Sequence, residues 1–194
     1  MGAQSKPKKE MGFNYGDYLK WPENERWELI GGVPYNMTPA PSRTHQEILV
    51  ALLNKFYNFL TDKECRVYVA PFDVRLPDGE EKEDEITTIV QPDLVVVCDQ
   101  GKLDDKGCLG PPDLIVEITS PSTARKDLKE KFSLYERMGV NEYWIVNPTD
   151  EIIMVFSLDP QRQYGRPSVY AIEDTIQVGI LDELSIPLKD IFKK

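Results

Sequence analysis

A glutamate in the middle of an otherwise apolar strand pattern constrains this chain more than any other feature. Residues 113–119 read DLIVEIT, and the alternation of Leu114, Val116 and Ile118, with many β-branched residues, predicts a β-strand. The turn-prone Ser-Pro-Ser that follows supports an end to the strand there. Burying an unpaired carboxylate is costly, so Glu117 must be neutral, paired, metal-bound or at an open cleft.

The size and composition fit one folded domain. The chain has 194 residues, of which 41% are hydrophobic and 10% aromatic, which is enough for a core and too apolar for wholesale disorder. No run approaches the roughly 18 apolar residues of a membrane span, and no signal-peptide pattern opens the chain. We expect a cytoplasmic protein without a membrane partner, with residues 1–12 as a disordered basic lead and residues 13–194 as a single domain.

The cysteines fit neither a zinc site nor a disulfide framework. Cys65, Cys98 and Cys108 are odd in number and lack the CxxC or Cys/His spacing of a metal site. The sequence therefore predicts reduced thiols, as in a cytosolic protein.

The net charge of −10 disfavours a nucleic-acid-binding role without excluding it. Proteins that bind nucleic acids mainly through the phosphates usually carry a basic patch. About half of the acidity is local, because residues 78–85 (DGEEKEDE) hold six acids and one lysine in a segment predicted to be a solvated loop. A local basic surface is compatible with this distribution.

The order of strand and helix patterns predicts an α/β (α+β) domain with a mixed sheet. The predicted elements are a hairpin over 25–37 turning at Gly31-Gly32, a helix over 44–60 capped by Thr44, strands over 66–76, 89–99 and 113–119, a helix over 122–138 and a hairpin over 142–158.

The single histidine lies near the middle of the apolar stripe of the first predicted helix. At about 100° per residue, His45 falls between Leu49 and Leu52 on the helix surface. Two interpretations are open: a buried, hydrogen-bonded structural histidine, or a functional one facing a cleft at the start of the helix.

One lysine faces inward in the second predicted helix. With Leu128 at the centre of the apolar arc, Lys131 falls inside that arc and Asp127 lies at its rim. An inward lysine requires a partner. That partner is either Asp127, in an i,i+4 ion pair, or the site that contains Glu117.

Asp93 gives the chain a second carboxylate of the same kind as Glu117. It follows Pro92 and opens an apolar run, which alone is a routine transition from loop to strand. Two carboxylates on adjacent central strands, however, repel each other unless a cation lies between them. Oxygen ligands with room for water and a substrate phosphate suit Mg²⁺, and a nearby lysine can orient the attacking water or stabilise the developing charge.

Taken together, these segments resemble the Uma-type restriction endonuclease family of the PD-(D/E)XK nuclease superfamily. The segments that carry the resemblance are Pro92-Asp93, DLIVEITSPST (113–123), DLKEKFSLYERMGVNEYWIVNP (127–148) and, upstream, WELIGGVPYNM (27–37) followed by His45. The likeness runs from about residue 13 to 192. It implies a restriction-endonuclease-like core, in which helices flank a mixed central sheet beside an N-terminal hairpin, and metal-dependent hydrolysis of DNA phosphodiester bonds.

The resemblance also implies which residues act. Asp93 matches the aspartate of the motif and Glu117 the (D/E) position, so both are implied metal ligands. Position 119 is Thr where the motif has Lys, and the residue that matches the displaced lysine of this family is Lys131 in the following helix. Because Thr119 supplies no cation, activity depends on Lys131 reaching the metal site.

Glu28 and His45 match further polar positions of the family pattern, with less defined catalytic roles. The resemblance implies Mg²⁺ as cofactor, with Mn²⁺ able to substitute, DNA as partner, and a homodimer, since duplex cleavage needs two active sites.

Two alternatives stay open. One is a catalytically inactive, dimeric binding or regulatory domain that retains the nuclease fold, which metal titration would distinguish. The other is a metal-independent hydrolase using Ser120 or Ser122, which would have only His45 as an imidazole base. Helix capping is the simpler role for those serines.

Overall fold

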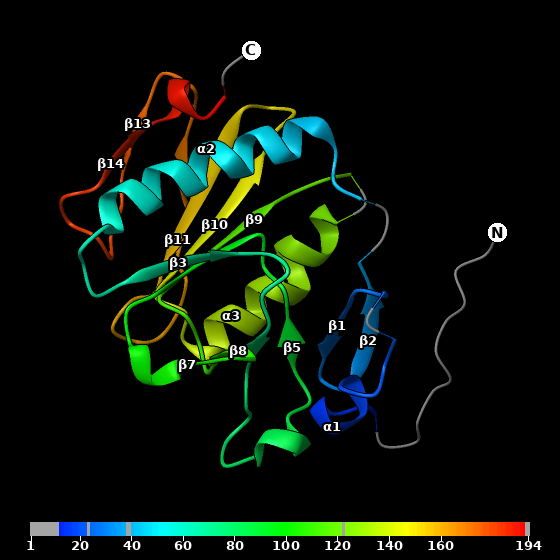
Figure 1. Ribbon diagram of the computed structural model, residues 1–194. Coiled ribbons are helices and arrows are strands. Elements are labelled where there is room, and N and C mark those ends of the chain that lie inside the picture. The colour runs from blue at the N-terminus through cyan, green and yellow to red at the C-terminus, as the bar shows by residue number, and fades with distance from the viewer. Residues whose placement is uncertain (1–11, 23, 38–39, 122, 193–194) are drawn as a thin grey trace.

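The computed structural model of the protein describes residues 12–22, 24–37, 40–121 and 123–192 (Figure 1). The predicted basic lead therefore lies outside the described residues, apart from Gly12, as does Ser122. None of the helices in the described ranges has the length and apolar character needed to cross a membrane.

A six-stranded mixed sheet forms the centre of the fold, in the order β12-β11-β10-β9-β6-β3. Only β9 and β10 run parallel, and the other neighbours are antiparallel. Its strands are β3 (Arg66–Val69), β6 (Leu94–Val97), β9 (Leu114–Ile118), β10 (Glu142–Asn147), β11 (Ile152–Ser157) and β12 (Ser168–Tyr170). Every residue of β9 is buried, which confirms that the strand holding Glu117 is central.

A second sheet of short strands packs beside the first, in the order β2-β1-β5-β4-β8-β7. Its strands are β1 (Trp27–Ile30), β2 (Val33–Asn36), β4 (Val74–Arg75), β5 (Ile89–Val90), β7 (Leu103–Asp104) and β8 (Gly107–Leu109). β13 (Thr175–Gln177) and β14 (Ser185–Pro187) form a separate antiparallel pair. The predicted hairpins β1-β2 and β10-β11 are both confirmed.

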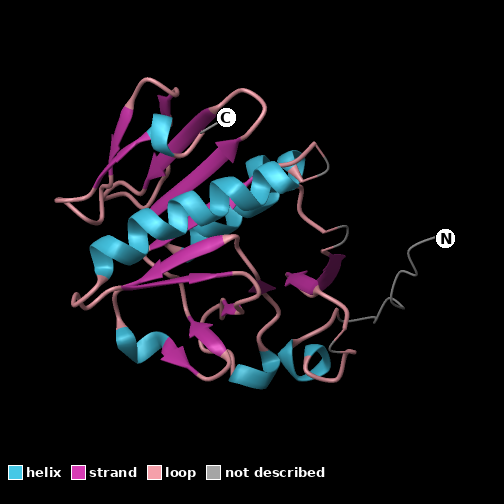
Figure 2. Cartoon of the chain, turned by 45° about the horizontal axis from the view of Figure 1, so that its top comes forward, coloured by secondary structure: helices cyan, strands magenta, loops and turns pink. Residues whose placement is uncertain are grey.

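Helices cover both faces of the central sheet (Figures 1 and 2). The described helices are α1 (Tyr15–Tyr18), α2 (Arg43–Leu60), the π-helix η3 (Lys126–Lys131), its continuation α3 (Phe132–Met138), and the 3₁₀ turns η1 (Glu83–Glu85), η2 (Gln100–Lys102) and η4 (Leu188–Asp190). Side chains alternate across the sheet, so Val116 packs in the core under α2 and Ile115 in the core under α3. The cap of α2 is Ser42, which accepts a hydrogen bond from the His45 backbone N–H, and not the predicted Thr44.

Two strands predicted as single units are each divided between the two sheets. The segment 66–76 forms β3 in the central sheet and β4 in the second, and the segment 89–99 forms β5 in the second sheet and β6 in the central one. Pro71 and Pro92 lie at the breaks, where the missing N–H cannot continue a strand ladder. Asp93 therefore lies where the chain crosses from one sheet to the other.

The helix predicted over 122–138 has the wrong phase in its first half. In η3 the Phe132 N–H bonds to the Asp127 carbonyl, the i→i+5 pattern of a π-helix, so side chains five apart lie on one side. Leu128, predicted at the centre of the buried arc, is 48% exposed, whereas Asp127 and Lys131 are each 2% exposed. The inward position predicted for Lys131 is thus confirmed, whereas the π-turn buries Asp127 beside it and exposes Leu128.

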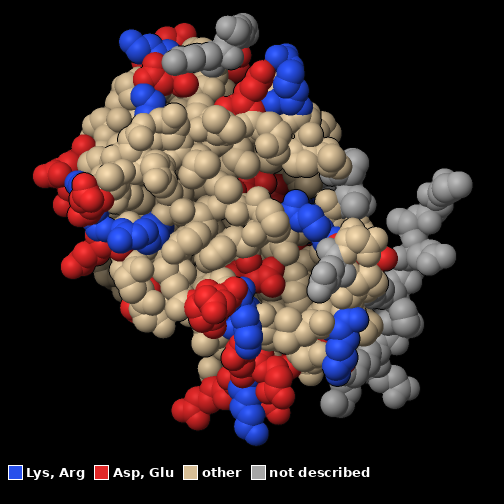
Figure 3. Space-filling model, viewed as in Figure 1, with Lys and Arg blue, Asp and Glu red and all other residues tan. Residues whose placement is uncertain are grey.

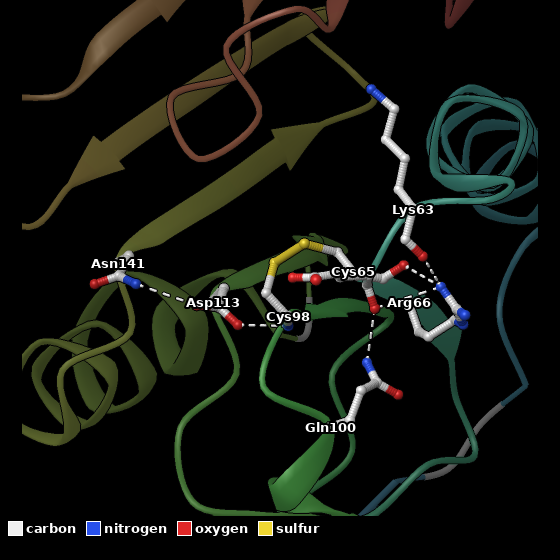
Figure 4. Close-up of a disulfide and its surroundings, with 8 residues drawn as sticks. Lys63, Cys65, Arg66, Cys98, Gln100, Asp113 and Asn141 are labelled. Atoms are coloured by element: carbon white, nitrogen blue, oxygen red, sulfur yellow. Dashed lines mark hydrogen bonds between the residues drawn. A yellow bond between two sulfur atoms is a disulfide. The ribbon is translucent and has the colours of Figure 1, made fainter.

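The prediction of three reduced thiols is wrong, because Cys65 and Cys98 form a disulfide (Figure 4). The antiparallel register of β3 and β6 pairs Arg66 with Val97, so the next residues outward, Cys65 and Cys98, stand opposite each other. The sequence separation of 33 residues between the two cysteines does not by itself predict this pairing. Cys108 is free and buried, and burial raises the pKa of its thiol to about 11.

The disulfide predicts a count of reactive thiols. Unfolded in urea without reductant, the protein should take up one iodoacetamide, at Cys108, and three after reduction, as measured by intact mass. In the chain-entropy model, a disulfide that closes a loop of this size stabilises the folded state by about 3–4 kcal/mol. The Cys65→Ser/Cys98→Ser variant should therefore unfold at a lower urea concentration than wild type. Uptake of three labels before reduction would contradict the bond.

Candidate active site

A cavity of about 600 Å³ opens at one end of the central sheet. The β1-β2 hairpin, the start of α2, the end of β9 and η3 surround it, and Figure 3 shows acidic and basic atoms side by side in a hollow near the start of α2. The five residues singled out in the sequence all line it: Glu28, His45, Asp93, Glu117 and Lys131. The fold thus brings together side chains from β1, α2, β9 and η3 and from the segment between β5 and β6.

Asp93 and Glu117 lie close together where β6 and β9 meet the cavity. The antiparallel register pairs Leu94, the first residue of β6, with Val116, so Asp93 directly precedes the paired segment and Glu117 directly follows Val116. Oδ2 of Asp93 accepts the Ile118 backbone N–H at 2.7 Å, and the charge of Asp93 contributes to the raised pKa of Glu117. The two carboxyl groups are therefore neighbours at this end of the strand pair.

Glu117 is held by two donors from the helix above it. Its Oε1 accepts hydrogen bonds from Lys131 Nζ at 2.7 Å and from the Tyr135 hydroxyl at 2.9 Å. Burial raises the pKa of Glu117 to about 8, against the opposing effect of the Lys131 ammonium and with a further rise from Asp127 and Asp93. Burial therefore favours the neutral form of this carboxyl group over a wider pH range than for an exposed glutamate.

Lys131 bridges two buried glutamates. Its Nζ lies 2.7 Å from Oε1 of Glu117 and 2.7 Å from Oε1 of Glu28, and its side chain is 3% exposed. Burial opposes the charged form, but Glu117 and Glu28 outweigh it and raise the pKa of Lys131 well above its ordinary value. Of the two partners open in the sequence, the observed ion pairs go to the Glu117 site and not to Asp127.

Glu28 joins the second sheet to the helix. It is fully buried in β1 and accepts from Lys131, from Lys126 Nζ at 2.7 Å and from the Gln91 backbone N–H at 3.1 Å. Burial disfavours its charge, but the ammonium groups of Lys131 and Lys126 outweigh burial and lower the pKa of Glu28. In a regular α-helix, at 3.6 residues per turn, Lys126 would lie on the outer face, and the π-turn brings it to the same side as Lys131.

His45 lies in the cavity wall and contacts Asp93. Its Nε2 is 3.1 Å from Oδ2 of Asp93, which also accepts the Ile118 backbone N–H at 2.7 Å. Nδ1 of His45 is buried and has no hydrogen-bond partner among the described residues. The imidazole is thus a neighbour of the acidic pair and not only a core residue.

The donor set of the acidic pair fits a hard divalent cation. No group of three or more His, Cys, Asp or Glu side chains in the described ranges forms a complete metal cluster. Each acid, however, has one oxygen engaged by the protein and a second, Oδ1 of Asp93 and Oε2 of Glu117, without a donor in the part of the chain that is described. Two carboxylate oxygens at an open cavity suit an ion that completes its shell with water and substrate oxygens.

Two residues of this site had no signal in the sequence. Tyr135 occupies an apolar position of the predicted helix, yet its hydroxyl donates to Glu117. Gln91 lies inside the predicted strand 89–99, but its backbone N–H donates to Glu28 and its side chain accepts from Arg26. Ser120 lines the cavity and is tied to the start of the helix, with its N–H donating to Thr123 Oγ1 at 3.0 Å.

Comparisons with known proteins find a family model, a relative and solved structures that this chain resembles. A family model, Uma2, described as "Putative restriction endonuclease", matches residues 15–189. "Uncharacterized protein slr1290" of Synechocystis sp. (strain ATCC 27184 / PCC 6803 / Kazusa) is 29% identical over 136 residues, or 69% of this chain and 67% of the relative. A crystal structure of "a putative nuclease belonging to DUF820" from Anabaena variabilis superposes with a TM-score of 0.74 at 19% identity, covering 93% of this chain and 97% of that one. The predicted fold class is confirmed by this superposition.

The raised pKa of Glu117 predicts a pH dependence of stability. Between its ordinary value of 4.5 and about 8, the folded state holds a proton that the unfolded state has lost, so this group's contribution to stability falls as pH rises. Glu117→Gln keeps an oxygen acceptor for Lys131 and Tyr135 and removes the titration. Relative to wild type, its free energy of unfolding should rise between about pH 5 and pH 8, by at most about 1.4 kcal/mol per pH unit. Urea denaturation at each pH measures this. A difference in unfolding free energy between the two proteins that stays constant from pH 5 to pH 8 would contradict the prediction.

Proposed function

Because this chain belongs to the Uma2 family, described as "Putative restriction endonuclease", whose model matches residues 15–189, we propose that it is a metal-dependent endonuclease that hydrolyses phosphodiester bonds in DNA. One observation carries the proposal: the ammonium of Lys131 lies 2.7 Å from Glu117, and Asp93, which accepts the Ile118 N–H beside Glu117, contributes to the raised pKa of Glu117. This arrangement supports a nuclease site built from two acids and a lysine, although Thr119 occupies the usual lysine position.

Asp93 and Glu117 would hold the metal ion, with Mg²⁺ as the expected ion and Mn²⁺ as a substitute. Both line the cavity, and each keeps one oxygen free of donors from the described chain. When bound, a divalent ion of this kind polarises the phosphoryl oxygens and lowers the pKa of a bound water.

Lys131 supplies the fixed positive charge of the site. The neighbouring Glu117 and Glu28 raise its pKa above that of an ordinary lysine, against the effect of burial, so it acts as a charge and not as a base. Held by Glu28 and Glu117, the ammonium needs no reorganisation to stabilise the negative charge that develops on the phosphoryl oxygens during attack by water. Glu28 and His45 serve as positioning residues, since they contact Lys131 and Asp93 respectively.

Assembly and location follow from the same proposal. We propose that the protein acts on duplex DNA as a homodimer, because two strands require two active sites. The cytoplasmic location stays a prediction, and the observed disulfide removes the cysteine argument for it.

Asp93→Asn should abolish metal-dependent cleavage and metal binding while leaving the protein folded. The amide oxygen can still accept the Ile118 N–H, and the loss of one charge relieves repulsion with Glu117. Mn²⁺ binding by calorimetry, plasmid cleavage and urea denaturation measure the three effects.

Glu142→Gln is the matched control for that variant, since Glu142 is a buried carboxyl on β10 that bonds to Trp144 and Ile180 outside the cavity. It should bind Mn²⁺ and cleave as wild type does. Unchanged metal binding in Asp93→Asn would remove Asp93 from the metal site.

Lys131→Met should lower turnover about 10²-fold or more, the scale for loss of one transition-state donor. It also deprives Glu28 and Glu117 of a shared cation, which for a buried ion pair costs about 3–5 kcal/mol of stability. The Lys131→Met/Glu28→Gln variant removes one of the stranded charges and should be more stable than Lys131→Met while staying inactive. If this folded double variant cleaves plasmid as fast as wild type, Lys131 is only a structural ion-pair partner.

A further inference from the structure

Arg26 stands in the cavity wall just before β1, two residues from Glu28. Its guanidinium is bound by a neutral side chain: Nε and Nη2 both donate to Oε1 of Gln91, at 3.1 and 2.9 Å. Nη1 makes no hydrogen bond within the described chain, so one edge of the guanidinium stays available for a ligand.

The charges that line the cavity are not evenly matched. Lys126 and Lys131 are ion-paired to Glu28, and Lys131 also to Glu117. Among the described residues, Arg26 is the one lysine or arginine lining the cavity that has no carboxylate ion-pair partner. Its positive charge is therefore left for a molecule that enters the cavity.

A hydrogen-bonded relay fixes the orientation of this guanidinium. Gln91 is 7% exposed, and its Nε2 donates to Oδ1 of Asp73 at 2.8 Å and to the Tyr18 hydroxyl at 3.1 Å. Because these acceptors engage the amide nitrogen, the amide oxygen must face Arg26. The Tyr18 hydroxyl in turn donates to Asp73 at 3.1 Å. The guanidinium is thus oriented by a neutral amide, with the Asp73 carboxylate one side chain further away, and its Nη1 edge can still donate to an anion.

We propose that Arg26 binds a backbone phosphate of the substrate strand that flanks the one being cleaved. This inference depends on the proposed function for the identity of the substrate, because the scissile phosphate is assigned to Asp93, Glu117 and Lys131. Guanidinium groups bind phosphate through paired N–H donors, which a lysine ammonium cannot reproduce. A cavity of about 600 Å³ has room for more than a single phosphate group.

A local cation of this kind would allow a chain of net charge −10 to bind a polyanion. Phosphate contacts fix the register of a strand without reading its bases. Arg26 therefore contributes to affinity for any sequence, and Gln91, whose side chain bonds to Arg26 and to the relay, is a positioning residue for it.

The test compares DNA binding by wild type, Arg26→Gln and Arg137→Gln. Arg137→Gln is the matched control: it makes the same charge change at an exposed arginine that ends α3 and pairs with Asp78 outside the cavity. Fluorescence anisotropy with a labelled DNA duplex, in Ca²⁺ to prevent cleavage, gives the affinity over a series of salt concentrations. Arg26→Gln should bind about tenfold more weakly and lower the salt slope by about one, whereas Arg137→Gln should retain both values.

Cleavage kinetics in Mg²⁺ separate this inference from the proposed function. Arg26→Gln should raise KM with a much smaller change in kcat, because a flanking contact is made in both ground and transition states. Arg26→Lys, which keeps the charge but not the paired donors, should recover part of the affinity. Urea denaturation checks that each variant is folded.

The outcomes are distinct. Wild type that binds DNA but cleaves none in Mg²⁺ or Mn²⁺ overturns the proposed function and leaves the phosphate site standing if Arg26→Gln binds more weakly. Wild type that cleaves while Arg26→Gln matches Arg137→Gln in affinity, salt slope and KM overturns the phosphate site alone. The phosphate site is also overturned if wild type binds no DNA duplex at low salt.

Discussion

The buried bridge of Lys131 between Glu117 and Glu28 is the interaction on which the rest of this site depends. It ties the central sheet, the second sheet and the helix at one point, and each partner would be costly to bury without the others. Removing one member of such a network leaves an uncompensated charge, at a cost of about 3–5 kcal/mol. Under the proposed function, the Lys131 ammonium that holds these elements together also supplies the positive charge that stabilises the substrate phosphate.

The junction between the two sheets explains why a cavity forms there. Two chain segments pass from one sheet to the other at Pro71 and Pro92, and the strands diverge where their ladders are interrupted. Asp93 follows the second crossing directly, where its Oδ2 bonds to Ile118 and His45. The acidic pair is thus supported by buried strands on one side and open to the cavity on the other.

The negative and positive charges of this protein are concentrated in different places, which its net charge does not reveal. The acidic segment 78–85 is anchored away from the cavity: the buried Arg75 pairs with Glu83 at 2.6 Å and with Asp104 at 2.6 Å. Within the cavity two lysines are balanced by glutamates, and the guanidinium of Arg26 faces a neutral amide. A large net negative charge is compatible with a local anion site, because salt screens the interaction between exposed charges beyond about 8–10 Å.

The sequence by itself determined the central strand with its buried glutamate, both hairpins, the long helix, and the requirement that Lys131 find a partner inside. Those features follow from periodicities of 2 and 3.6 residues and from the cost of burying charge, which are local properties. Only the tertiary structure decided the rest: the π-turn that brings Lys126 inward, the relay that aims Arg26, and the Cys65–Cys98 bond. Each of these depends on hydrogen bonds or strand register between segments far apart in the chain, or on a helix phase that such contacts select, and no local pattern encodes them.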